Sequence, residues 1–448
     1  MINECLKQKP LPTGEIHEWQ PPPTQFPYST IYEEIEAYYS AASKQLLNIL
    51  VKEHGLYDQI KAVRRYLLFG DLGSDAISHL LSIAHAELHT SASSISKTAL
   101  NESLDTSLVG SSIAAGHTSK DNQSERYRQI NISKIGRIFE LSLRSTLAAK
   151  DPFNESICVD LKTVDYITEI GQVLSMNTSI ENRLPGTKKT EKINSLSVID
   201  VFCLNFDANW PNNIVLSKKN LTHYQMIFRH LLYCKVVEHK LVGVWHSCTA
   251  NCKQKSKVSG YGFAGIVGNR GVSKTDYHIL SVCRAMLSFV RSFKYYMSNE
   301  VVQPYWADFE DNLTKVEDLD QVLEFQAKFL DSVMKDCLLS NRTLLCMMSQ
   351  LLDTCQEFAK AMVKVLPKNY ENKENFGEMG MNSDMETGDL ESGIDSEKTS
   401  EEITRLQRKF EKYLAELLAE LTKLSSRTAD NALFGLALKL NYNEFYSN

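Results

Sequence analysis

Glycines between residues 260 and 275 form the pattern in this chain that most resembles a site of chemistry. A G-x-G-x-x-G motif starts at Gly260, and residues 268–275 (GNRGVSKT) nearly match a phosphate-binding loop. In a dinucleotide-binding fold such glycines follow a strand and open a helix, so that backbone amides meet the pyrophosphate. Here the preceding residues, KQKSKVS, have no strand pattern, and Ser273 stands where a glycine would let amides wrap a phosphate. The pattern favours a flexible loop, with a nucleotide-binding protein using residues 260–275 as the alternative.

Two groups of histidine and cysteine residues invite a metal interpretation. His85 and His89 stand one helical turn apart, a spacing that can hold zinc, but Glu87 does not directly follow the first histidine as it does in a zinc protease. No third ligand accompanies them. The second group lacks a further ligand pair; it consists of His246, Cys248 and Cys252. We therefore expect no metal, no cofactor and no catalytic residues, hence a protein that is not an enzyme.

The composition predicts an intracellular protein without a membrane segment. The chain has 448 residues, of which 43% are hydrophobic, enough for about two to four domains. It contains no run of about 18 apolar residues that could span a bilayer, and its first residues have no hydrophobic signal core. The ten cysteines are accordingly expected as thiols in a reducing compartment.

Charge is distributed unevenly along the chain. The net charge is 49 − 55 = −6, and residues 367–402, with eleven acidic and three basic residues, contribute −8 of it. This segment has few large apolar residues, which predicts a disordered acidic loop. The remainder is near +2 and has no block of lysine or arginine, so a protein that binds nucleic acid through its phosphates is not expected.

Apolar residues recur at spacings of three and four in several segments, which predicts a mostly helical protein. The clearest helices are expected at residues 31–49, 221–241, 279–296, 322–338, 344–362 and 403–424. The first is marked by a stripe of Ile31, Ile35, Tyr38, Ala42, Leu46 and Ile49. The helix at 279–296 should end before Pro304. Strand patterns are best at residues 198–206 and 214–216, and polar interruptions predict loops at 91–129, 177–196 and 249–275. The fold class is therefore all-α, with stacked helical bundles and a few short strands.

The most distinctive run of residues lies at 206–241. It contains a W-P pair, a short apolar run, L-T-x-Y-Q-M-x-F-R-H and Y-C-K-x-V-E. Further characteristic stretches start at Cys283 and Val316, and the chain closes on LNYNEFY at residues 440–446. In this order the stretches resemble the gamma-tubulin complex component family, and most of all its component two. The resemblance spans most of the chain, with gaps.

The resemblance implies a division of the chain. Residues 1–30 are expected as a Pro-rich tail. Residues 31–196 would complete the family's amino-terminal grip module and begin a helical linker region. Residues 197–448 would form the carboxy-terminal grip module, with the acidic loop at 367–402 inside it. The long amino-terminal half of the family has no counterpart in this chain.

The same resemblance implies a scaffold that binds gamma-tubulin and other gamma-tubulin complex components, and templates microtubule nucleation. Its location would be the cytoplasm and the cytoskeleton, at a microtubule-organising centre or spindle pole. Nucleic acid and membranes are not expected partners. A helical adaptor that kept the fold and changed its partners is an alternative, which the sequence does not separate from the first.

Contact with gamma-tubulin would be made by the carboxy-terminal module. Because tubulins are acidic, basic and aromatic side chains are the expected contacts. One expected helix supplies Arg284, Arg291, Lys294 and Tyr295, and the distinctive run supplies Tyr224, Arg229 and His230. The alternative for Arg284 and Arg291 is an ordinary surface pair, with Phe289 and Tyr296 in the core. For the second group the alternative is a place inside the bundle.

Overall fold

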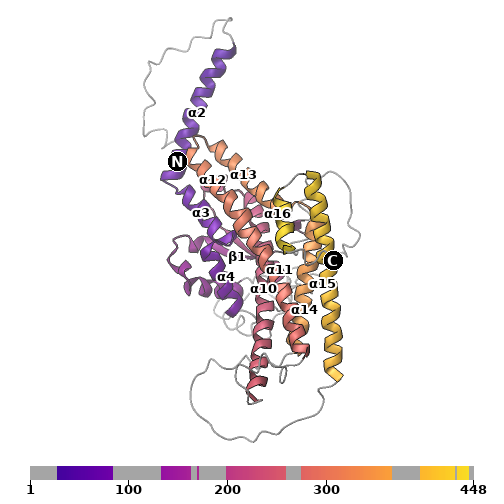
Figure 1. The fold of residues 1–448 in the computed structure, drawn as a ribbon. Coiled ribbons are helices and arrows are strands. Elements are labelled where there is room, and N and C mark those ends of the chain that lie inside the picture. Colours follow the sequence, from indigo (N-terminus) through magenta and orange to yellow (C-terminus); the bar gives the residue numbers. More distant parts are fainter. Residues whose placement is uncertain are drawn as a thin grey trace, which may run out of the picture.

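The computed structural model describes residues 28–83, 133–162, 169–170, 198–258, 274–365, 394–428 and 431–442. Helices dominate this part of the chain, and a single pair of short strands accompanies them (Figure 1). The prediction of an all-α fold is confirmed. None of the described helices combines the length and the apolar character needed to cross a bilayer. The predicted boundary at residues 196 and 197 adjoins residues outside the described ranges and stays a prediction.

Helix α10 (Lys218–Val258) lies at the centre of the bundle. Its residues are buried almost all round between Tyr224 and Val237, as expected for a helix enclosed by other helices. It packs against elements on several sides: α3 (Leu56–Leu67), β2 (Phe202–Phe206), α11 (Lys274–Tyr295), α13 (Leu319–Asp336) and α14 (Arg342–Val365). The predicted loop at 249–275 is wrong for residues 249–258, which extend α10, and for residues 274–275, which begin α11; residues 259–273 lie outside the described ranges.

The two strands form one antiparallel pair, β1 (Ile157–Leu161) with β2. Val159 lies opposite Leu204, and both side chains are buried. The predicted strand at 198–206 is confirmed for its second half only, since α9 (Val198–Val201) is a helical turn. The predicted strand at 214–216 is wrong. Its amides bond locally, for example from Leu216 N to Asn212 O at 2.9 Å, which leaves them unavailable to a neighbouring strand.

A helical rod runs without interruption from α11 through a π-helical segment, η6 (Tyr296–Val302), into α12 (Gln303–Lys315). The prediction that the helix ends before Pro304 is confirmed for α11, which ends at Tyr295, although helical backbone continues through η6 into α12. Pro304 lies in the first turn of α12, where a missing amide is tolerated, and the wider turn of η6 before it accommodates the ring. Beyond it, Trp306 and Phe309 pack against Phe329 of α13.

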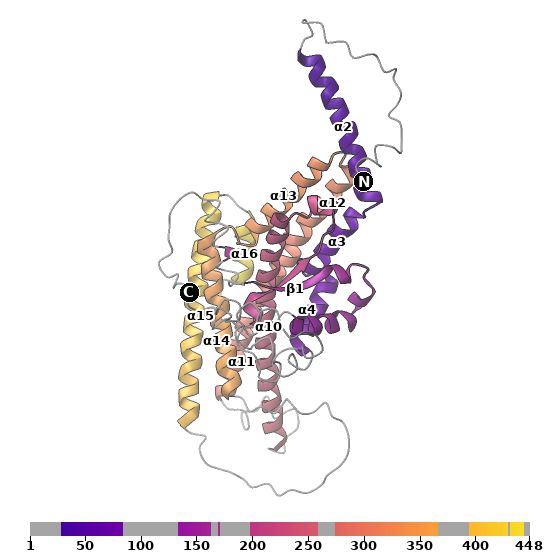
Figure 2. The ribbon, with the colours of Figure 1, turned by 180° about the vertical axis from the view of Figure 1, so that it is seen from behind.

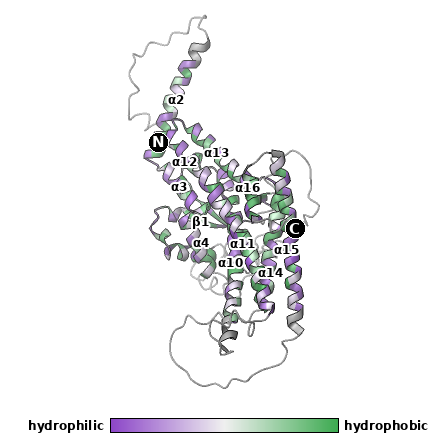
Figure 3. Cartoon of the chain, viewed as in Figure 1, coloured by the Kyte–Doolittle hydropathy of each residue, from purple (hydrophilic) through white to green (hydrophobic). Residues whose placement is uncertain are grey.

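Helices α14, α15 (Ile394–Thr428) and α16 (Asn431–Leu440) complete the carboxy-terminal side of the bundle. Hydrophilic and hydrophobic residues alternate along α15, as expected for a helix with one covered face and one face in solvent (Figure 3). Because α15 starts at Ile394, the predicted disordered loop is wrong for residues 394–402; its remainder lies outside the described ranges.

Helix α2 (Tyr28–Lys52) projects away from the bundle, and only its carboxy-terminal half lies beside α13 (Figures 1 and 2). Its first three residues, 28–30, are helical, although they were expected as part of the Pro-rich tail. The chain then turns at Gly55, whose φ of 59° is a left-handed conformation that favours glycine. Helix α4 (Asp71–Ile83) packs closely on α3 at Gly73. A larger residue would not fit there, because a Cβ at this position would lie only 2.5 Å from the carbonyl oxygen of Arg65.

Candidate functional site

An exposed line of side chains runs along α11 on the outside of the bundle. Residues on the opposite face of this helix, including Val282, Met286 and Phe293, are buried. The line carries basic, aromatic and small polar groups and no acidic one. We call it the α11 outer line, and its members are Tyr277, Ser281, Arg284, Ser288, Arg291 and Tyr295. It contains three of the four residues predicted on this helix.

The fourth residue, Lys294, joins Arg291 at one carboxylate of α10. Arg291 Nε lies 3.0 Å from Glu238 Oε1, and Lys294 Nζ forms a short hydrogen bond with the other oxygen. The Glu238 side chain is only 13% exposed, whereas that of Arg291 is 56% exposed. The carboxylate therefore lies beneath the two basic groups and holds them in place while Arg291 still faces solvent.

Lys235, one turn before Glu238 on α10, belongs to the same cluster. Burial, with the charges of Lys294 and Arg291, lowers the pKa of Lys235, although Glu238 and Asp75 of α4 oppose the shift. Burial alone would raise the pKa of Glu238, but hydrogen bonds from Lys294 and Arg291 outweigh it and hold that pKa below its ordinary value. We name Lys235, Glu238, Arg291 and Lys294 the Glu238 cluster. Its three basic groups and one acid give 3 − 1 = +2.

The alternative interpretation of α11 is also partly realised. Arg291 does form a surface pair, and Phe289 and Tyr296 are core residues at 4% and 2% exposure. Arg284 differs, because it is exposed and has no ion pair with any described residue. Tyr295 is exposed as well, at 56%. Arg284, Arg291 and Tyr295 are thus accessible from solvent, which a contact residue requires.

Tyr224, Arg229 and His230 occupy the core of the bundle. Tyr224 is fully buried, and the centroid of its ring lies 6.4 Å from that of Phe329. The ring of His230 meets that of Phe293 edge to face, with 5.6 Å between the ring centroids. Arg229 is 3% exposed. The prediction that these three contact a partner does not fit their burial, because at most 3% of any of them reaches solvent. Their place agrees with the alternative inside the bundle, where α10 turns this face toward its neighbours.

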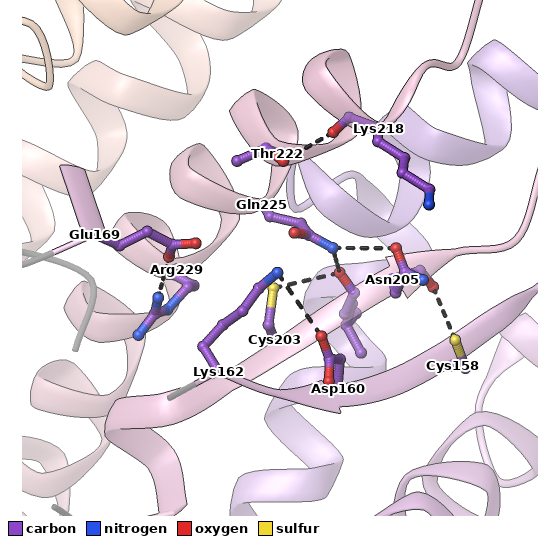
Figure 4. Close-up of polar contacts among 11 residues, drawn as sticks. Cys158, Asp160, Lys162, Glu169, Cys203, Asn205, Lys218, Thr222, Gln225 and Arg229 are labelled. Carbon is purple, nitrogen blue, oxygen red and sulfur yellow. Dashed lines mark hydrogen bonds and ion pairs between the residues drawn. The ribbon is translucent and has the colours of Figure 1, made fainter. Parts of the chain in front are cut away.

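The buried polar groups of α10 attach the strand pair to the bundle (Figure 4). Arg229 forms an ion pair with Glu169 and donates from Nη2 to the carbonyl of Asp200 at 2.8 Å. One turn earlier, Gln225 Nε2 donates to the carbonyl of Leu204 at 3.2 Å and to Asn205 Oδ1 at 3.1 Å. These residues have a structural role, since Gln225 satisfies polar groups of β2 and Arg229 satisfies a carbonyl of α9 directly before it.

The patterns that suggested chemistry are only partly within the described ranges. The glycines of the 260–275 loop lie outside them, and only Lys274 and Thr275 are seen, at the start of α11. His85 and His89 also lie outside. Cys248 is buried on α10 at 2% exposure. Within the described residues no three His, Cys, Asp or Glu side chains are placed to hold a metal ion.

Sequence reasoning missed the acids that organise these groups. Glu238 lies 53 residues from Arg291 and 56 from Lys294, and Glu169 lies 60 residues from Arg229. No local spacing signals such pairs. One hint was present, since Lys235 and Glu238 stand three residues apart and therefore share a face of α10.

Comparison with known proteins gives a consistent result. Residues 56–446 match the family model described as gamma tubulin complex component C-terminal. The chain is 28% identical over 438 residues to mouse gamma-tubulin complex component 2, covering 93% of this chain and 42% of the relative. It is 27% identical over 330 residues to Arabidopsis thaliana gamma-tubulin complex component 2, covering 73% and 40%. It is 26% identical over 411 residues to the fission yeast spindle pole body component alp4, covering 90% and 48%. The chain thus spans less than half the length of these relatives.

Proposed function

Since this chain belongs to the gamma-tubulin complex component family, we propose that it is a non-catalytic subunit that binds gamma-tubulin and helps to template microtubule nucleation. Its other partners would be further gamma-tubulin complex components. Its place would be the cytoplasmic cytoskeleton, at a microtubule-organising centre or spindle pole, as the name of the fission yeast relative suggests.

The proposed activity needs geometry rather than bond-making. Spontaneous assembly of a microtubule nucleus is slow, because several tubulins must each lose translational and rotational freedom before their mutual contacts compensate. A scaffold that already holds gamma-tubulin removes part of this cost by raising the effective concentration of the next subunit. The helical rod of α11, η6 and α12 offers a stiff support for such a task.

The observation that best supports a partner surface is the α11 outer line together with the Glu238 cluster. Two of its basic groups, Arg291 and Lys294, are held in place by a mostly buried carboxylate. Such a surface complements an acidic partner, steers its approach and loses little side-chain entropy on binding. We assign the gamma-tubulin contact to Arg284, Arg291, Lys294 and Tyr295.

Direct binding tests the proposal. Purified protein is expected to co-purify with gamma-tubulin at micromolar concentration, as measured by size-exclusion chromatography of the mixture. Absence of a complex at ten micromolar of each protein would contradict the proposal and favour an adaptor that has changed its partners.

Arg291→Glu tests the assigned surface. Reversing this charge removes attraction to an acidic partner and places a second carboxylate beside Glu238. We expect gamma-tubulin binding to weaken by roughly tenfold at low salt, about 1.4 kcal/mol, with a smaller effect at high salt. Microscale thermophoresis at two salt concentrations would measure it.

The matched control is Lys412→Glu, a charge reversal on the exposed face of α15, where the lysine side chain is 71% exposed. It changes the net charge equally and should leave the affinity near that of the wild type. Equal weakening by both variants would remove α11 from the contact and leave only a general charge effect.

A further inference from the structure

The exposed positions of α11 follow one regular spacing from the first residue of the helix to its last. They are Lys274 and the six members of the α11 outer line, and successive positions alternate between three and four residues apart. Every other residue of this helix is half-buried or buried. The spacing averages 3.5 residues, from (295 − 274)/6. This is the repeat of the seam along which two α-helices pack against each other.

The residue types on the α11 outer line repeat as well. Ser281 and Ser288 are seven residues apart, and so are Arg284 and Arg291. Seven residues of helix are two turns and span about 10 Å. The serines are small and permit a second helix to approach closely, whereas each guanidinium can bind a carboxylate through two hydrogen bonds.

The charges around α11 favour an acidic partner. The helix itself has four basic residues and one acid, Asp276, so its charge is 4 − 1 = +3. Neighbouring helices add Lys235 and Glu238 of α10, Asp75 of α4 and Glu411 of α15, which reaches α11 through a bridging glutamine. The group as a whole stays positive, at 5 − 4 = +1. None of these acids is on the α11 outer line.

The two arginines of the line are able to bind carboxylates from outside. Arg284 is exposed and forms no ion pair with a residue in the described ranges. Arg291 bonds Glu238 through Nε, which leaves its terminal nitrogens for a second carboxylate. Carboxylates seven residues apart on another helix match this separation, whereas a β-strand repeats about every 6.6 Å and does not. A helix that follows the line crosses α11 at about 20°.

We propose that the partner places an acidic helix lengthwise along the α11 outer line. Its carboxylates recur every seven residues and bind Arg284 and Arg291, and its larger side chains pack over the two serines between them. Tyr277 and Tyr295, which are 45% and 56% exposed, cover the two ends of the contact. The identity of the partner rests on the function proposed above, in which it is gamma-tubulin. The form of the recognition follows from the α11 outer line alone.

Two helical peptides of identical composition test this recognition without gamma-tubulin. In the first, glutamates recur every seven residues along one face; in the second, they recur every five residues and spread around the helix. Both peptides are about three heptads long. We expect the first to bind the protein at about 10 to 100 μM in low salt, and about tenfold more tightly than the second. Fluorescence anisotropy of the labelled peptides would measure both affinities.

A pair of double variants locates the peptide on α11. Arg284→Gln with Arg291→Gln removes both carboxylate contacts and should abolish the preference for the first peptide. Arg408→Gln with Lys412→Gln removes two positive charges from exposed positions of α15 and should keep the preference.

Added bulk distinguishes a packed helix from a diffuse attraction to basic groups. Ser288→Phe leaves the charge unchanged but blocks close approach, so it should weaken binding of the first peptide and of gamma-tubulin by about tenfold at low and high salt alike. Ser288→Ala should bind both as the wild type does. Ser426→Phe adds the same ring at an exposed position of α15 and should have no effect.

Three results would overturn the inference: equal affinity for the two peptides, no binding of either at about 1 mM, or full binding by Ser288→Phe. If gamma-tubulin nevertheless binds, the proposed function stands and the line acts as a diffuse basic patch. If the first peptide is preferred but gamma-tubulin forms no complex, the helix recognition stands and the proposed function fails.

Discussion

Replacement of Glu169 with alanine is expected to lower the free energy of unfolding by about 3 to 5 kcal/mol. Glu169 forms the ion pair with Arg229, whose side chain is only 2% exposed. Without the carboxylate, the guanidinium loses this ion pair and keeps the carbonyl of Asp200 among its acceptors. Removing one member of a buried ion pair is costly, because water does not take the place of the lost charge. Urea unfolding followed by circular dichroism would measure it.

Two further variants separate this effect from the loss of an ordinary ion pair. Glu416→Ala removes the exposed acid of the Lys412–Glu416 pair on α15 and should change stability by less than about 0.5 kcal/mol. Glu169→Leu combined with Arg229→Met removes both charges and should be less destabilising than Glu169→Ala. If the double variant proves the less stable of the two, the buried charge is not the cause.

His230 should make the protein acid-sensitive. Burial lowers the pKa of this histidine from 6.5 to about 4, so the folded protein holds it neutral. The unfolded chain takes up a proton near pH 6.5 that the folded chain refuses until about pH 4. The stability that depends on neutral His230 is therefore fully present above pH 6.5 and is lost as the pH drops from 6.5 toward 4. This group alone should remove about 2 kcal/mol by pH 5 and about 3 kcal/mol by pH 4.

Comparison of His230→Phe with the wild type would isolate this contribution. The variant keeps an aromatic ring against Phe293 but has no titrating group, so its stability should fall less between pH 7 and pH 5. Phe228→Leu, a buried substitution on the same helix, should lower stability by a similar amount at both pH values. Parallel pH profiles for His230→Phe and the wild type would contradict the assignment.

The sequence was most informative where one apolar face decides the packing. The spacings at 322–338, 344–362 and 403–424 correspond to α13, α14 and α15, whose predicted apolar residues are largely buried. It was least informative for α2. Its predicted stripe is real, but the described part of the bundle covers the face carrying Leu47 and Leu50 instead. Periodicity shows that a helix has an apolar face, and not which of two such faces a neighbour will occupy.

The distinctive run at 206–241 shows why the partner surface was harder to predict from the sequence than the core. Its recognisable residues, among them Tyr224, Arg229 and His230, are recognisable because α10 is enclosed on all sides and each must fit its neighbours. Solvent-facing positions such as Arg284 meet no such demand within the chain. A pattern that identifies the family therefore points first to the core. The partner surface depends on pairs such as Glu238 with Arg291, which only the folded chain brings together.

Segment η6 sets the rotational phase between the two halves of the rod. Its looser winding decides that Arg291 faces outward on α11 while Trp306 and Phe309 face inward on α12. Because a π-helix takes more residues per turn than an α-helix, rewinding residues 296–302 as regular α-helix of the same length would rotate everything beyond them and carry the two aromatic rings out of their seat against Phe329. The winding of this segment, and not its length alone, should consequently fix the direction in which the aromatic face of α12 points.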